Sequence, residues 1–106
     1  MKTLPRLLAE WSRTVTDVER SYPLTYDDYL NDLDGRRALE HAARDAEQPP
    51  AWHEALAALD DRFRDATFES PTCAWGDDVA ADEGWTAESH WYYWRHPIRH
   101  EGAWFD

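Results

Sequence analysis

The sequence predicts a mainly α-helical protein, in which a three- to four-helix N-terminal layer precedes an irregular, tryptophan-rich C-terminal segment with room for a short β-hairpin. Three observations predict this class. Apolar residues recur at steps of three and four through residues 3–66. The periodicity stops after Thr67, where Gly, Pro, Ser and Thr interrupt the chain. The length of 106 residues fits a single domain, 1–106, with a helical part over residues 3–66 and an aromatic, acidic part over residues 67–106.

Residues 3–22 form the clearest predicted helix. Thr3 can cap its start, Pro5 is tolerated in a first turn, and Pro23 discourages continuation. The face opposite the apolar stripe alternates basic and acidic residues at helical spacing, so we expect a balanced, solvated surface without function there. The apolar stripe consists of Leu4, Leu7, Leu8, Trp11, Val15, Val18 and Tyr22.

A second helical unit begins at Thr25 and ends before Pro49 and Pro50. Thr25 and Asp28 have the spacing of a capping box, with Asp in place of the usual Glu. The apolar stripe starts with two tyrosines and two leucines, but it changes phase after Gly35. We therefore predict a break or bend in the helix near Asp34–Gly35.

Residues 51–66 form a third predicted helix, with Pro50 at or near its first position. The side chains expected to face inward are Trp52, Ala55, Leu56, Leu59, Phe63 and Ala66, and those expected to face solvent are Glu54, Asp61 and Asp65.

Residues 67–106 show no sustained helical period. The run HWYYWR, residues 90–95, is rich in aromatic side chains, which fit a pleated surface, so it is the first candidate for a short strand. The run TCAW, residues 72–75, is the candidate for its partner.

The charge of the chain limits the classes of partner. Its 22 acidic and 11 basic residues give a formal net charge of −11, which repels nucleic acid and anionic lipid and attracts basic proteins. We therefore expect no nucleic-acid or membrane partner. A single cysteine excludes an intrachain disulfide, and no run of 18 apolar residues is present. We expect a soluble, cytoplasmic protein, and the sequence leaves its oligomeric state open.

No motif in the chain indicates a reaction, so we expect no catalytic residues and no cofactor. His90, His96 and His100 lie close together in the sequence, but no cysteine pair or HExxH motif accompanies them. Pro97 also biases His96 toward an extended conformation, so we predict packed histidines without a metal site. Cys73, beside alanine and tryptophan, is predicted to be a small buried hydrophobe.

Tryptophans and acidic residues indicate where binding would occur. Five of the seven tryptophans lie in the last third of the chain, and a core of this size can hardly bury them all. No Lys or Arg occurs between Asp65 and Trp94, although acidic residues are frequent there. We predict that Asp77, Asp78, Asp82 and Glu83 steer a basic partner and that Trp85 and Trp91 anchor it. A second candidate face contains Asp27, Asp28 and Asp32.

The favoured hypothesis is a non-catalytic acidic protein that recognises a basic protein. Its most concrete form is a bacterial immunity protein or antitoxin that inhibits a toxin such as a nuclease. One alternative is a DNA mimic that blocks a nucleic-acid-binding protein, which needs regularly spaced carboxylates. Another is a small enzyme or small-molecule binder, which needs an aromatic pocket with a perturbed carboxylate or histidine inside.

Overall fold

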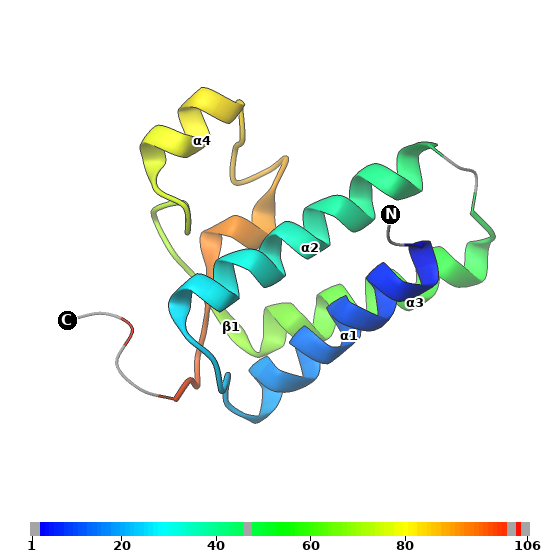
Figure 1. Ribbon diagram of the computed structural model, residues 1–106, viewed down its shortest axis with the longest axis horizontal. Coiled ribbons are helices and arrows are strands. Elements are labelled where there is room, and N and C mark those ends of the chain that lie inside the picture. Colours follow the sequence, from blue (N-terminus) through cyan, green and yellow to red (C-terminus); the bar gives the residue numbers. More distant parts are fainter. Residues whose placement is uncertain (1–2, 46–47, 102–103, 105–106) are drawn as a thin grey trace.

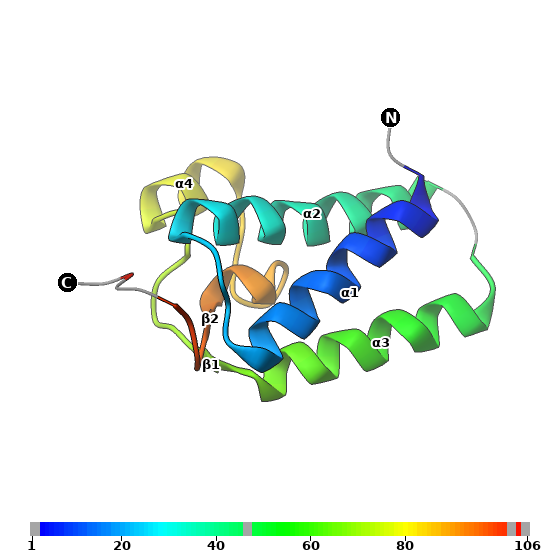
Figure 2. The same ribbon diagram turned by 60° about the horizontal axis from the view of Figure 1, so that its bottom comes forward.

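The computed structural model describes residues 3–45, 48–101 and 104 and confirms the mainly helical class. Three long helices, α1 (Leu4–Arg20), α2 (Tyr26–Asp45) and α3 (Pro50–Asp65), form one layer (Figure 1). Helix α1 packs against both of the others and crosses diagonally between them (Figure 2). The remaining described segments gather around the end of the layer where α2 begins.

Helix α2 is continuous, and the predicted break near Asp34–Gly35 is wrong. A side chain at Gly35 would meet no atom within 4 Å, so the glycine marks neither a turn nor a close approach. The capping box is confirmed, because the Asp28 N–H donates to Thr25 Oγ1 while Asp28 Oδ2 accepts from the Thr25 N–H, both at 3.2 Å. Beyond Gly35 both Arg36 and Leu39 are buried, so a buried charged side chain interrupts the apolar pattern within one continuous helix.

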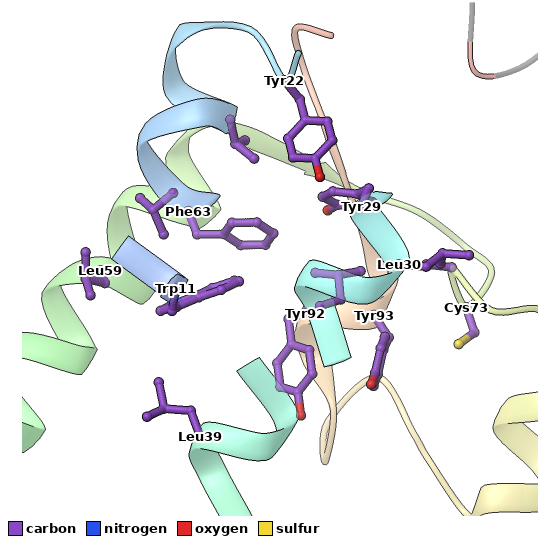
Figure 3. Close-up of a cluster of buried hydrophobic side chains, with 14 of the residues drawn as sticks. Trp11, Tyr22, Tyr29, Leu30, Leu39, Leu59, Phe63, Cys73, Tyr92 and Tyr93 are labelled. Atoms are coloured by element: carbon purple, nitrogen blue, oxygen red, sulfur yellow. The ribbon is translucent and has the colours of Figure 1, made fainter. Parts of the chain in front are cut away.

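The core lies where α1, α2 and α3 meet (Figure 3). Trp11 from α1 contacts Phe63 from α3, with 4.8 Å between ring centroids, and both rings are fully buried. The space between α2 and α3 is closed by a 3₁₀ turn, η1 (Trp91–Trp94), whose Tyr92 and Tyr93 are completely buried. The C-terminal segment therefore completes the core of the helical layer, since neither α2 nor α3 covers this side alone.

The predicted hairpin region pairs differently from the expectation. Strand β1 (Thr67–Glu69) pairs antiparallel with β2 (Arg95–Pro97), in the register Phe68 to His96. HWYYWR is therefore mostly turn and 3₁₀ helix, and only its last residue belongs to a strand. TCAW forms no strand, although the Ala74 N–H donates to the carbonyl of Tyr93 at 2.7 Å. The aromatic composition favoured a strand, but burial of both tyrosines between α2 and α3 requires a tighter turn.

A fourth helix, α4 (Asp77–Glu83), was not predicted. It stands beside the first half of α2, outside the three-helix layer (Figures 1 and 2). Within the described part of the chain, no helix has the length and apolar character needed to span a membrane.

Candidate binding surface

Helix α4 is defined by a glycine at each end. Gly76 precedes it with φ of 103°, and Gly84 follows it in the left-handed conformation with φ of 75°, a region that residues with a Cβ rarely adopt. The Trp85 N–H donates back to the Ala80 carbonyl at 2.9 Å, which closes the C-terminal end. This Gly–acid–acid start and glycine stop could have predicted the helix from the sequence, despite its shortness.

Hydrogen bonds from α2 hold the segment that carries α4. Asp34 of α2 accepts from the Trp75 indole N–H at 3.0 Å and from the Tyr93 hydroxyl. The Tyr26 hydroxyl donates to the Ala74 carbonyl. Trp85 stacks on Tyr93 with 4.5 Å between centroids and 13° between planes. These contacts fix both ends of α4, so its outer face is presented by a rigid support.

The four predicted steering residues all lie on α4. Asp77, Asp78, Asp82 and Glu83 are exposed. Among residues 3–45, 48–101 and 104, none of these four carboxylates lies within the 4.0 Å of a basic group that defines an ion pair. Asp77 has one local role, because its Oδ1 accepts the Cys73 N–H at 3.2 Å. The other three carry charge without a bonded partner in the described structure.

Six of the ten arginines form ion pairs with acids elsewhere, on the long helices and the hairpin. The ion pairs of the described residues are Arg6–Glu10, Arg36–Asp60, Arg44–Glu40, Arg62–Glu19, Arg64–Asp61 and Arg95–Glu69. The lack of bases in the sequence from residue 66 to 94 is therefore not compensated at α4 by the fold.

Two apolar side chains accompany the acids at the surface. Trp75, just before α4, is 36% exposed, and Val79, inside α4, is 36% exposed. The sequence did not single out either residue as a site, because their exposure depends on how α4 is placed against α2. Together they supply apolar area beside four carboxylates, an arrangement that suits protein–protein contact.

The structure places the predicted anchors Trp85 and Trp91 against different helices. Trp85 is half-buried on Tyr93, and the Arg37 guanidinium lies 5.1 Å above its ring. Trp91 packs on Phe63 of α3, with the Arg64 guanidinium 3.9 Å from its ring centroid. Both indoles therefore already bind intramolecular cations. Only Trp85 adjoins α4, and Trp75 is the more exposed indole there.

The five C-terminal tryptophans lie between the two extremes of full burial and free exposure. Trp85, Trp91, Trp94 and Trp104 are partly buried and pack against the core, whereas Trp75 is the most exposed of the set. The prediction that the core would not bury them all is confirmed.

The second predicted face is divided by the geometry of α2. Asp27 is exposed in the first turn, and Asp28 is part of the capping box. Asp32 accepts a hydrogen bond from the buried Tyr22, and burial raises the pKa of its carboxyl above the ordinary value. Asp28 and Asp32 therefore have structural roles, whereas Asp27 forms no ion pair with any residue that the structure describes.

The histidines and the cysteine are packed as predicted. His96 is buried in the extended strand β2 between Phe68 and two tyrosines of α2, and burial lowers its pKa below the ordinary value. Cys73 is buried, and burial raises the pKa of its thiol. In the part of the chain that the structure describes, no three His, Cys, Asp or Glu side chains are grouped as a metal ion requires.

Comparison with known proteins adds no relative: no family model, no curated protein and no solved structure matches this chain.

Proposed function

We propose that this protein is a non-catalytic binding protein that recognises a basic protein through the outer face of α4. The observation that carries the proposal is the set of exposed carboxylates on α4 without ion-pair partners among the described residues. Trp75 and Val79 add apolar contact area beside them. In its most concrete form the proposal is an immunity protein or antitoxin that covers the active site of a basic toxin such as a nuclease.

The placement of the acids within α4 supports a role outside folding. Asp77 and Asp78 lie in the first turn, where the helix dipole stabilises negative charge. Asp82 and Glu83 lie in the last turn, where the dipole disfavours negative charge and a base would be expected. A carboxylate pair at this position destabilises the free protein, so an external cationic surface is a consistent reason for its presence.

The test compares two triple variants with matched chemistry. The variant D78N/D82N/E83Q removes three α4 charges but keeps Asp77, which caps the Cys73 turn. The control E54Q/D61N/D65N removes three exposed charges from α3, one of them in the exposed Arg64–Asp61 pair, and both proteins change the net charge of −11 by the same amount.

Each immobilised protein is used to capture partners from the native cell extract at low salt, followed by elution with rising salt and then kinetic measurement on the purified partner. We expect the wild type and the α3 control to retain one basic partner. The α4 variant should bind it with a slower association rate and a flatter salt dependence. Equal rates and salt slopes for both variants would refute the proposal. A captured nucleic-acid-binding protein that DNA displaces would instead favour the DNA-mimic alternative.

A further inference from the structure

A depression of about 260 Å³ lies where the end of α3 meets η1 and the hairpin of β1 and β2. Its lining combines two basic side chains and two indoles, Arg64, Arg95, Trp91 and Trp94, and Glu69 is the acid among its described lining residues. Positive charge is therefore in excess here, on a chain whose net charge is −11. The depression contains no residue of α4, so it is independent of the surface proposed above.

Arg95 is held in one orientation by the backbone around it. Its Nε donates to Thr67 Oγ1 at 2.7 Å, and its Nη2 donates to the carbonyls of Arg64 at 3.1 Å and Thr67 at 3.0 Å. Its Nη1 donates to no residue that the structure describes, yet this atom is not among the buried atoms that lack a hydrogen bond. The Nη1 donors of a fixed guanidinium are thus open to solvent and available to a ligand.

The present partner of Arg95 Nη1 is the Glu69 carboxylate, which lies 3.6 Å away, beyond hydrogen-bond distance. The Glu69 side chain is 87% exposed. Such an exposed ion pair contributes little, because water screens the charges and fixing a long side chain costs entropy. A ligand carboxylate can therefore replace Glu69 at Nη1, while the backbone pairing of Glu69 with Arg95 holds the hairpin in register.

Arg64 and the indoles provide flat surfaces beside these donors. The Arg64 guanidinium lies 3.9 Å from the ring centroid of Trp91, and its side chain is 45% exposed. Its Nη1 also lies 3.4 Å from Asp61, which is 76% exposed and does not line the depression. A guanidinium stacked on one ring has a second face for another planar group. The Trp94 indole, packed against the core, is a further flat wall.

We propose that this depression binds a small aromatic carboxylate. The carboxylate accepts hydrogen bonds from Arg95 Nη1 in place of Glu69, and the ring packs on the Arg64 guanidinium and the Trp94 indole. One negative charge matches the excess of one positive charge among the described lining residues. A phosphate monoester carries about two charges at pH 7 and would add repulsion to an acidic protein. The volume is below the roughly 300–1,000 Å³ of drug-sized pockets, which limits the ligand to about one ring.

The test is a titration with benzoate, followed in ¹H–¹⁵N correlation spectra through the indole N–H signals of Trp91 and Trp94 and the Nε–H signal of Arg95. We expect saturable shifts of these three signals and intermolecular NOEs from the benzoate ring to the Trp94 indole. Benzamide keeps the ring without the charge, and acetate keeps the charge without the ring. Each should bind at least about fivefold more weakly than benzoate, since each lacks one of the two contacts.

Exposed residues supply variants that leave the fold intact. Glu69→Gln removes the competing carboxylate, so benzoate should bind about two- to fivefold more tightly. Glu54→Gln is the matched control, because it removes the same charge from an exposed position on α3 outside the depression and should leave the affinity nearly unchanged. Arg64→Gln should weaken the binding of benzoate more than that of benzamide. Unchanged dispersion of the amide signals verifies that each variant is folded.

Three results would mean that benzoate only associates with exposed positive charge, and each would overturn the proposal. They are shifts that rise linearly without saturation, equal affinities for benzoate and acetate, and an equal gain of affinity in Glu69→Gln and Glu54→Gln. Tighter binding of phenyl phosphate than of benzoate would overturn the assignment of a carboxylate ligand.

Discussion

Arg36 on α2 and Asp60 on α3 form a bidentate ion pair inside the helical layer. Arg36 Nε donates to Asp60 Oδ1 at 3.1 Å and Nη2 donates to Oδ2 at 2.9 Å, and both residues are buried. The Trp11 indole N–H of α1 donates to the same carboxylate at 3.1 Å. One carboxylate therefore connects all three long helices, and the Arg36 guanidinium also lies 5.1 Å above the Tyr92 ring.

Asp60→Ala is predicted to be among the most destabilising single substitutions in this protein. It leaves the Arg36 charge buried without a counter-ion and the Trp11 N–H without an acceptor, which costs about 3–5 kcal/mol. Urea unfolding followed by tryptophan fluorescence measures the change. Glu19→Ala is the control, because it breaks the exposed pair with Arg62 and should cost at most about 1 kcal/mol. Similar losses of unfolding free energy in both variants would show that the buried pair stabilises the protein no more than the exposed pair does.

Two glycine-to-alanine substitutions are predicted to have opposite signs. Gly35 is inside the continuous helix α2 with no atom near a new Cβ, so Gly35→Ala should stabilise the protein by about 0.5–1 kcal/mol. Gly84 has φ of 75° at the end of α4, so Gly84→Ala should destabilise it by about 1–2 kcal/mol. Thermal unfolding by circular dichroism measures both. If Gly35→Ala destabilised the protein, this result would support the bend near Gly35 that the sequence predicted.

Stability is predicted to fall as the pH drops below about 6.5, in part through His96. Burial lowers the pKa of this histidine in the folded protein, so the unfolded chain binds protons first as the solution is acidified. Its contribution is fully present above the unfolded pKa near 6.5 and is lost as the pH falls toward the folded pKa. Urea unfolding between pH 7.5 and 5.5 should show a smaller slope for His96→Gln than for the wild type. His90, whose pKa burial also lowers, accounts for part of the remaining slope.

Charges at the two ends of α4 are predicted to affect stability unequally. Glu83→Gln removes a carboxylate from the last turn, and Asp78→Asn removes one from the first. The helix dipole stabilises the Asp78 carboxylate in the first turn and destabilises the Glu83 carboxylate in the last turn. Glu83→Gln should therefore melt roughly 2–5 °C above Asp78→Asn at low salt. In 1 M NaCl the gap should largely disappear, since the Debye length is then about 3 Å. A gap that salt does not change would point to packing instead of electrostatics.

Particular residues show how far prediction from the sequence reaches. The stripe from Leu4 to Tyr22 and the capping box at Thr25 and Asp28 depend on neighbours within one turn, so their patterns were sufficient. The predicted break at Gly35 failed because packing against α1 and η1 maintains the helix despite the weak propensity of glycine. The strand expected over residues 90–95 failed for a similar reason: the tyrosines follow the space between α2 and α3, which the local pattern does not contain.

The candidate surface shows the same division. The acidic residues of α4 are exposed because they are charged, and the sequence alone indicated that they have no basic residue nearby in the chain. It could not indicate that Trp91 lies against α3, that Trp75 stays at the surface, or that Asp28 and Asp32 have structural partners. These facts depend on which residues distant in the chain meet in space.

By itself, the sequence determined the helical class and the excess of negative charge with its local lack of bases. It also determined the bounds of α1 and α3 to within two residues. These properties belong to composition and to contacts within a few residues. Only the tertiary structure decided the pairing of β1 with β2 and the burial of Arg36 against Asp60. The physical reason is that burial and long-range pairing are properties of surfaces brought together from separate helices, and no local pattern specifies which surfaces those are.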